Sequence, residues 1–336
     1  MRLRRSHPHA DGFSRRRRGT GFSYLDAEGN VIEDTEVVER IRTLAIPPAW
    51  DDVWICPFPN GHIQAVGTDD AGRRQYLYHD DWRVAQDAGK HDRVRQLARK
   101  LPAFREAVDA DLDRKGLDRR RVLAVALRML DYGVLRTGNT QYADENGSRG
   151  AATLLRRDVR VSHGKLVFDF RAKGGQRRTA ELDDDKLVAA VRSLKRGRHP
   201  RLLMYRDRDG YHEIDAGMIN DRFHELVGDD FTVKDLRTWT ATVHAAVDLA
   251  EADPPATKQA LNAAVQEMLD EVSDHLGNTP AVARSSYVDP RVLEQFEHGR
   301  TIAETVRRVG DDLDDEHTRA GLERSVNKLL DQDTRE

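Results

Sequence analysis

The chain has 336 residues, of which 34% are charged and 38% hydrophobic, and its formal net charge is −3 at pH 7. This length allows two domains that each bury a core, and the composition is typical of a globular protein with a well-solvated surface. No apolar run reaches the roughly 18 residues of a membrane-spanning helix, and no signal peptide is expected. Cys56 is the only cysteine, which excludes an intrachain disulfide and favours a reducing, cytoplasmic setting.

Positive charge is concentrated at the N-terminus, where residues 1–18 contain seven arginines against one acidic residue, Asp11. We interpret residues 1–19 as a basic, flexible arm that either meets a polyanionic partner or only keeps the chain soluble. The far end is acidic and holds a cluster of Asp311, Asp312, Asp314, Asp315 and Glu316. This cluster is typical of a solvated face or a linker. The acidic balance does not exclude nucleic acid, because close phosphate contacts set affinity.

Residues 20–84 are predicted to form a β-rich domain. Short runs that mix aromatic and apolar residues predict strands at 21–25, 31–32, 53–55, 63–66 and 74–78. Residues 26–30, between the first two runs, indicate a hairpin turn. A short helix is expected at 35–44, before a rigid proline turn at 46–50.

Residues 85–336 are predicted to form a larger, mainly helical domain. The segment 121–130 is apolar nearly all round, which indicates a central buried helix. Three apolar runs predict a three-stranded β insert at 159–161, 166–170 and 178–182. Further helices are expected at 184–195, 215–227, 234–250 and 256–275, with short ones at 280–298 and a charged one at 301–331. The predicted fold class is therefore α+β.

Familiar enzyme motifs are absent, among them the phosphate-binding glycine loop, the nucleophile elbow and the paired histidines of a zinc protease. The thirteen histidines lack ligand spacing, so neither a metal site nor a cofactor is expected. The remaining residues suit phosphodiester transesterification. Arginine offers a planar, permanently charged fork for phosphate oxygens, and tyrosine is a workable nucleophile. The leaving sugar hydroxyl needs a proton from a positioned acid.

The chain supplies these parts in order. Arg136 follows the predicted buried helix, and Lys173 lies at the second turn of the β insert. Arg237 lies on a predicted helix, Asn278 follows the next helix, and Tyr287 comes nine residues later. Two arginines on different elements can hold one phosphate from two sides.

Together these segments resemble the type IB DNA topoisomerases, in their small bacterial and poxvirus-like form. The resemblance covers about residues 20–300 and rests on segments 46–50, 75–78, 136–146, 173, 234–238 and 277–287. It implies that Tyr287 attacks to form a 3′-phosphotyrosyl link, while Arg136 and Arg237 hold the phosphate oxygens. Lys173, with Arg136, would protonate the leaving 5′-oxygen. Asn278 stands where many members carry histidine, and its amide can donate a hydrogen bond but cannot add a charge.

The resemblance also implies a monomeric, two-lobed clamp on double-stranded DNA that relaxes both supercoil signs without ATP or an obligatory metal. A location at the nucleoid is expected. The residues expected to contact DNA are Gln75, Tyr76 and Tyr78 in the smaller domain, and Gln141, Tyr142 and Lys234 in the larger one. Glutamine can read adenine in the major groove, and tyrosine can reach phosphates or bases.

Plainer explanations stay open for each residue. Arg136 can be a helix-end ion-pair partner, Lys173 a solvated turn residue, and Tyr287 a core tyrosine. Arg237 can pair with Asp235, and Asn278 can cap the helix that opens at residue 280. Strand residues 75, 76 and 78 can be ordinary sheet residues.

Two other functions remain as alternatives. A tyrosine site-specific recombinase uses a similar set of residues but usually carries a histidine where this chain has Asp235. A DNA-binding architectural protein would need the basic arm and the hairpin but not the full catalytic set.

Overall fold

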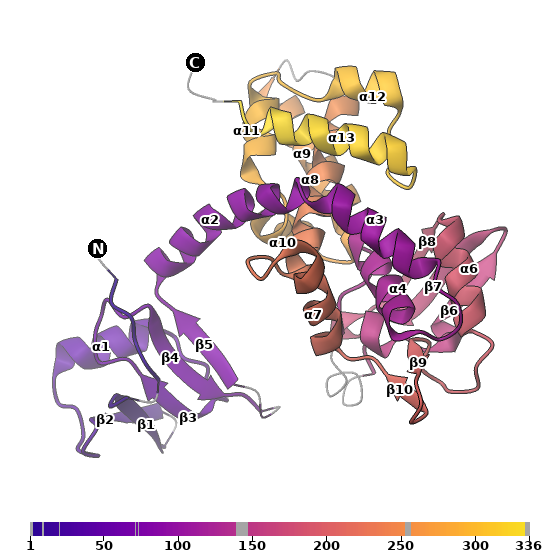
Figure 1. Cartoon of the computed structure of the whole chain (residues 1–336). Helices are drawn as coiled ribbons and strands as arrows, with labels where there is room; N and C mark the ends of the chain where they lie inside the picture. The colour runs from indigo at the N-terminus through magenta and orange to yellow at the C-terminus, as the bar shows by residue number, and fades with distance from the viewer. Residues whose placement is uncertain are drawn as a thin grey trace. The chain divides into compact units, whose positions relative to one another are not determined.

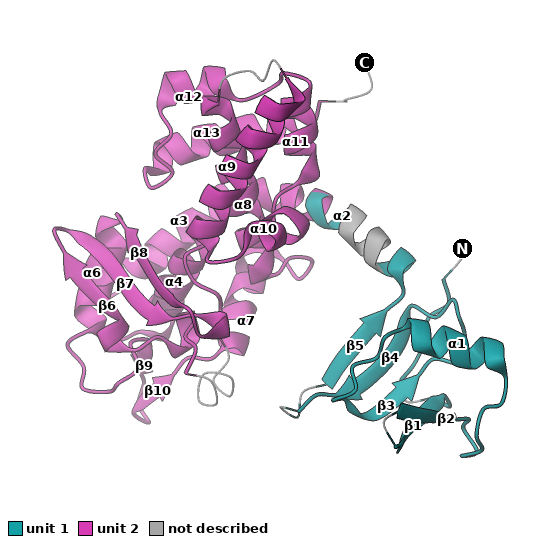
Figure 2. Ribbon diagram, turned by 180° about the vertical axis from the view of Figure 1, so that it is seen from behind, with its two compact units in different colours: residues 1–91 teal, residues 92–336 magenta. Residues whose placement is uncertain are grey.

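The computed structural model describes residues 3–8, 10–19, 21–70, 72, 74–138, 147–252 and 257–332, and of residues 83–88 only the backbone. The chain divides into two compact units, residues 1–91 and 92–336 (Figure 2). The division falls within helix α2 (Asp80–Ala98), which also contains the boundary expected after residue 84. Across the described residues, no helix has both the length and the apolar character needed to cross a membrane.

The first unit is built on an antiparallel sheet of five strands in the order β2-β1-β3-β4-β5 (Figure 1). These strands are β1 (Phe13–Arg18), β2 (Gly21–Leu25), β3 (Asp51–Ile55), β4 (Ile63–Thr68) and β5 (Arg74–Tyr78). Helix α1 (Thr35–Thr43) begins at Asp34, whose side chain accepts from the backbone N–H groups of the first turn. Ile41 of α1 packs with Val53, Ile55 and Ala65 in a small core.

The predicted flexible arm is wrong for residues 13–18, because they form β1 and pair with β2 and β3. The reason lies in Arg15, whose guanidinium donates to the carbonyl oxygens of Ile46, Pro47 and Trp50 at 3.2, 2.7 and 2.6 Å. One arginine of the basic run therefore closes the proline turn. The strand expected at 31–32 is also wrong, since it is reduced to one bridge between Leu25 and Val31.

The second unit is mainly helical, and its antiparallel sheet of three strands packs beside α4 and α6 (Figure 1). The sheet consists of β6 (Val159–Ser162), β7 (Lys165–Arg171) and β8 (Arg177–Leu182). The helices are α3 (Leu101–Leu112), α4 (Arg119–Asp131), α6 (Asp185–Leu194), α7 (Ala216–Val227), α8 (Val233–Glu251), α9 (Lys258–Leu276), α10 (Pro280–Ser286), α11 (Pro290–Glu297), α12 (Ala303–Val309) and α13 (Glu316–Leu329). Short 3₁₀ turns are η1 (Ala151–Thr153), η2 (Arg156–Asp158) and η3 (Lys173–Gly175). A β9 (Met204–Arg206) and β10 (Tyr211–Glu213) hairpin was not predicted.

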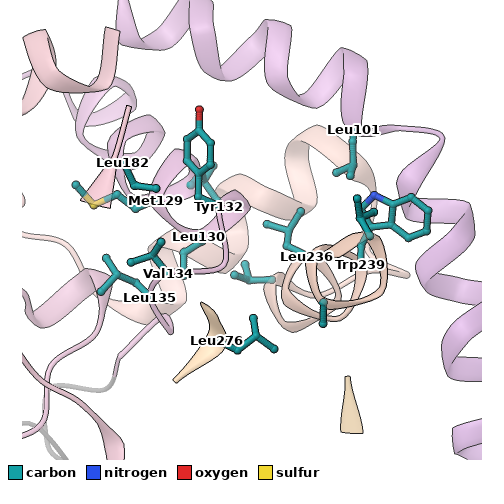
Figure 3. Packing of buried hydrophobic residues seen from close by; sticks show 14 of the residues in the cluster. Leu101, Met129, Leu130, Tyr132, Val134, Leu135, Leu182, Leu236, Trp239 and Leu276 are labelled. Atoms are coloured by element: carbon teal, nitrogen blue, oxygen red, sulfur yellow. The ribbon is translucent and has the colours of Figure 1, made fainter. Parts of the chain in front are cut away.

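These elements confirm the α+β class, with a small β-rich unit and a larger, mainly helical unit that contains a three-stranded insert. Helix α4 is buried along nearly its whole length, as its composition predicts. Figure 3 shows the core around it, where Leu135, Leu236 and Leu276 are labelled. These three side chains are at most 2% exposed. Each lies one or two residues from a predicted site residue, so the core holds the backbone of the site in place.

The single charged helix expected at 301–331 is wrong, because the structure has two helices there, α12 and α13. Gly310 ends α12 with a φ of 88°, a backbone conformation that favours glycine. Asp315 then caps α13, and its side chain accepts from the backbone N–H of Thr318 at 2.8 Å. The acidic cluster therefore contains the start of a helix.

Candidate active site

Arg136 lies on the loop that follows α4. Gly133, with a φ of 73°, turns the chain out of the helix, and buried Leu135 anchors the loop in the core. The carbonyl oxygen of Arg136 accepts from the backbone N–H of Ala151 at 2.8 Å. Its half-buried guanidinium donates from Nη2 to Oδ1 of Asn278. The loop and the side chain are therefore both held in place, with an amide rather than a carboxylate as the side-chain partner.

Lys173 lies at the tip of the β7–β8 hairpin, in the turn η3. Gly174 and Gly175 have φ values of 82° and 78°, which explains why this turn needs two glycines. Nε of Arg171 donates to the carbonyl oxygen of Gly175 at 3.2 Å and closes the turn. The side chain of Lys173 is exposed at this tip.

Arg237 lies on the second turn of α8 and is only 5% exposed. Its Nη1 donates to the carbonyl oxygen of Gly133 at 2.7 Å, and its Nη2 donates to that of Leu276. Its Nε is buried and has no hydrogen-bond partner among the described residues. A buried guanidinium with a spare donor is available to a further acceptor.

Asp235 does not pair with Arg237, so that plainer explanation is wrong. The carboxylate of Asp235 accepts from the backbone N–H of Thr232 at 2.8 Å and forms an ion pair with Arg93 at 3.2 Å. It therefore begins α8 as part of a capping box. The position where a recombinase usually carries histidine has a structural role here.

Asn278 follows the C-terminal end of α9, where Gly277 takes the left-handed conformation at a φ of 61°. Thr279 is the residue that caps α10, since its side chain accepts from the backbone N–H of Val282 at 3.4 Å. The alternative that Asn278 is the cap is therefore wrong. With Oδ1 occupied by Arg136, the amide nitrogen Nδ2 is buried without a described partner. The side chain thus offers a spare donor.

Tyr287 directly follows α10 and is 9% exposed. The guanidinium carbon of Arg237 lies 5.4 Å from the centre of its ring. Burial raises the pKa of the Tyr287 hydroxyl, but the positive charges of Arg237, Arg136 and Lys234 outweigh burial, and the pKa is lowered. This environment favours loss of the phenolic proton.

A small pocket collects most of these groups. Its lining includes the cations Arg136, Arg149, Lys173, Arg178 and Arg237, and none of its described lining residues is acidic. None of the five forms an ion pair with a carboxylate of the described residues. A concave site with this many unneutralised cations favours an anion.

Burial and the repulsion between these cations lower the pKa of two of them, Arg237 and Arg178. Burial, followed by the neighbouring charges of Arg136 and Arg178, lowers the pKa of Arg237 to about 9. Burial and the charge of Arg136 lower the pKa of Arg178 to about 10. Both groups therefore stay protonated at neutral pH, at an energetic cost that a bound anion would relieve.

The other residues that are predicted to contact DNA lie in both units. Tyr76 and Tyr78 are 44% and 40% exposed on β5 and stack with ring centres 6.1 Å apart. Gln75 is less exposed and donates to Asp69 at 2.9 Å. In the second unit, Lys234 is exposed on α8 and lies close enough to affect Tyr287. The predicted contacts Gln141 and Tyr142 lie outside the described residues.

Sequence reasoning missed Arg149 and Arg178, although both line the pocket. The available signal was the pair Arg177-Arg178, because successive residues of a strand face opposite sides and one of them must face inward. The pair alone does not say which one.

Two family models of known proteins match the chain, one mainly in each of its two units. A family model described as the catalytic core of eukaryotic DNA topoisomerase I matches residues 79–311. A model of the N-terminal domain of bacterial DNA topoisomerase IB matches residues 21–69. The chain belongs to the type IB DNA topoisomerases, in their small bacterial and poxvirus-like form. It is an isomerase that acts on DNA.

Individual relatives agree with this assignment. DNA topoisomerase 1B of Acanthamoeba polyphaga mimivirus is 30% identical over 299 residues, which cover 86% of this chain and 88% of the viral protein. DNA topoisomerase 1B of Vaccinia virus (strain Western Reserve) is 24% identical over 241 residues, covering 68% of this chain and 71% of that protein. A solved XerH site-specific recombinase bound to its difH substrate covers 59% of this chain and 51% of its own, at 15% identity and a TM-score of 0.38. That likeness is too weak to support an argument.

Proposed function

We propose that this chain relaxes positively and negatively supercoiled DNA by cutting and resealing one strand, without ATP and without an obligatory metal ion. The observation that carries the proposal is the cationic pocket. Arg136, Lys173 and Arg237 line it without a described acidic neighbour, and Tyr287 lies beside Arg237. One phosphodiester group would balance this charge and meet the nucleophile at the same place.

Tyr287 would act as the nucleophile. Its hydroxyl oxygen attacks the phosphorus and loses its proton as the new bond forms, and the bond to the 5′-oxygen breaks. The product is a 3′-phosphotyrosyl link that conserves the bond energy, so resealing needs no ATP. The lowered pKa of Tyr287 supports this role, because it makes the proton easier to lose.

Arg136 and Arg237 would bind the non-bridging phosphate oxygens as negative charge develops there. Preorganised donors of this kind stabilise a transition state strongly, and each contributes about 2.7–4 kcal/mol. Asn278 would add a neutral hydrogen bond from Nδ2, the atom that has no described partner in the free protein.

Lys173 would deliver the proton that the leaving 5′-oxygen requires, with the help of Arg136. Its place at an exposed hairpin tip suits a group that must reach into DNA. The released 5′ end would then rotate in a controlled manner, which relaxes either supercoil sign. The reverse reaction, attack of the 5′-hydroxyl on the phosphotyrosyl link, reseals the strand.

Outside the pocket, we propose that Gln75, Tyr76, Tyr78 and Lys234 contact the duplex and that the enzyme works as a monomer at the nucleoid. The exposed tyrosine pair on β5 supports the first part, because stacked aromatic side chains on a surface strand suit contacts with bases or phosphates.

The direct test uses plasmids of negative and of positive supercoiling, incubated separately with the protein in chelator and without ATP. Relaxation of both is expected. Relaxation of one sign only, or complete loss in chelator, would contradict the proposed mechanism. A recombinase would require paired recombination sites, and an architectural protein would leave no covalent protein–DNA link.

A further inference from the structure

Arg178 lies on the strand that leaves the Lys173 hairpin, five residues after the lysine. It is paired with Phe170 across the β7–β8 ladder. The preceding residue, Arg177, points outward, and its exposed guanidinium forms a bidentate pair with Asp169 at 2.7 and 2.6 Å. Because side chains alternate along a strand, Arg178 points inward.

The inward guanidinium contacts the end of α9. Its Nη2 donates to the carbonyl oxygen of His275, one of the last carbonyls of that helix. The guanidinium of Arg178 also lies so close to Gly277 that a Cβ added to Gly277 would overlap the guanidinium. Arg178 therefore joins the β7–β8 hairpin, which carries Lys173, to the turn that carries Asn278.

The charge of Arg178 is only partly balanced, because Asp274 acts to raise the pKa of Arg178 but burial and the charge of Arg136 outweigh it. Arg178 forms no ion pair with a carboxylate among the described residues, and its Nε is buried without a partner there. It shares the pocket with Arg136 and Arg237. A purely structural link in this place would be made at lower cost by an uncharged side chain, because a charge without a carboxylate partner is costly to remove from water, and Arg178 is half-buried.

We propose that Arg178 is a positioning residue of the active site: it holds the hairpin against the α9–α10 turn and so sets where Asn278 and Lys173 stand relative to the phosphate. The inference rests on the proposed function, since it assigns Arg178 to the same phosphate site. Arg178 acts here through the backbone of His275 and Gly277, and not by touching the reacting atoms.

The test is single-turnover cleavage of a short DNA duplex by Arg178→Gln, with Arg177→Gln as the matched control. Both variants lose one positive charge from the same strand. A displacement of a catalytic group by about 1 Å costs about a hundredfold in rate, so Arg178→Gln is expected to cleave about a hundredfold more slowly. Arg177→Gln should stay within about threefold of the unmodified chain, because its ion pair is exposed.

A double-mutant cycle with Asn278→Ala separates positioning from a general structural effect. If Arg178 acts through Asn278, Arg178→Gln should slow the Asn278→Ala enzyme at least tenfold less than it slows the unmodified enzyme, since residues linked through one network couple. Thermal unfolding is measured on every variant. Should Arg178→Gln fail to fold, the cycle is repeated with Arg178→Lys, which keeps the charge but loses the planar fork.

Two results would overturn the inference. One is cleavage by Arg178→Gln within about threefold of the unmodified chain, and the other is full additivity with Asn278→Ala. Covalent complex formation by the unmodified chain is measured first. Its absence would contradict the proposed function, whereas an active chain with a fast Arg178→Gln variant would contradict only the role of Arg178.

Discussion

Two groups of arginines in the second unit, which are buried or half-buried, show opposite electrostatic environments. In the first, Arg105 pairs with Asp131 at 2.8 Å and with Glu323 at 2.7 Å, while Arg319 pairs with the same two carboxylates at 3.0 and 3.3 Å. In the second, Arg237 and Arg178 donate to backbone carbonyls and have no described carboxylate partner. The first group is neutral within itself, and the second is not.

The direction of the pKa shift follows this difference. Burial opposes the charge of Arg105, but Asp131 and Glu323 outweigh it and raise the pKa of Arg105 well above its usual value. Burial and like charges lower the pKa of Arg237 to about 9. A balanced arginine cluster joins parts of the fold, here α3, α4 and α13, whereas an unbalanced one is prepared for an anion.

The largest effect is expected at Tyr287, the proposed nucleophile. Tyr287→Phe removes the oxygen that is proposed to attack while leaving the cationic pocket intact, so relaxation and covalent trapping on DNA should disappear while binding is retained. The measurement is plasmid relaxation together with denaturing gel analysis of labelled DNA. A covalent complex that persists in Tyr287→Phe would show that another residue attacks.

Truncating one arginine from each cluster tests whether the two clusters have different roles. Arg237→Ala should slow cleavage by about 10²–10³-fold, because it removes a proposed donor to the phosphate. Its cost in unfolding free energy should stay below about 2 kcal/mol, since relief of an unpaired charge offsets two lost hydrogen bonds to carbonyls.

Arg105→Ala should give the reverse pattern. It leaves Asp131 and Glu323 with one arginine between them, and breaking a buried ion pair costs about 3–5 kcal/mol of stability. Cleavage by the folded fraction should change far less than in Arg237→Ala. Denaturant unfolding and single-turnover cleavage on both variants check this, and equal stability losses would remove the distinction between the clusters.

A smaller effect is expected at Asn278, whose Oδ1 accepts from Arg136 and whose Nδ2 is a donor without a described partner. Asn278→Asp keeps the acceptor for Arg136 but loses the donor and adds a negative charge, so cleavage should fall about a hundredfold. Asn278→His restores a donor and should stay within about tenfold of the unmodified rate. A greater loss in Asn278→His than in Asn278→Asp would contradict the proposed hydrogen bond to phosphate.

The smallest expected effect is the uptake of protons that accompanies DNA binding. A phosphate bound at Arg237, as proposed, would favour the charged form of its guanidinium and raise its pKa above the value of about 9 in the free protein. DNA binding should therefore take up more protons at pH 9 than at pH 7, where Arg237 is already charged, so affinity should fall as pH rises through 9. Calorimetry of Tyr287→Phe in two buffers of different ionisation enthalpy measures this uptake. Because Tyr287 raises the pKa of Arg237, uptake in this variant should begin at a lower pH than in the unmodified chain. Equal uptake at both pH values would argue against an unbalanced Arg237.

Much of the fold could be predicted because its signals are local. The apolar 121–130 segment became the buried helix α4, and the three runs between 159 and 182 became the sheet β6-β7-β8. The failures are places where distant residues intervene. Residues 13–18 carry the charge of a solvated arm, yet Arg15 is held by carbonyls more than 30 residues away.

The sequence by itself determined the order of the elements and the ordered set from Arg136 to Tyr287, because periodicity, turn chemistry and motif spacing act over short stretches. Tertiary structure alone decided which arginines are balanced. Arg105 meets Glu323 across 218 positions, and Arg237 meets the Leu276 carbonyl across 39. Only such long-range contacts determine whether a buried charge has a partner. They also decide that Arg178, and not its neighbour Arg177, faces the pocket.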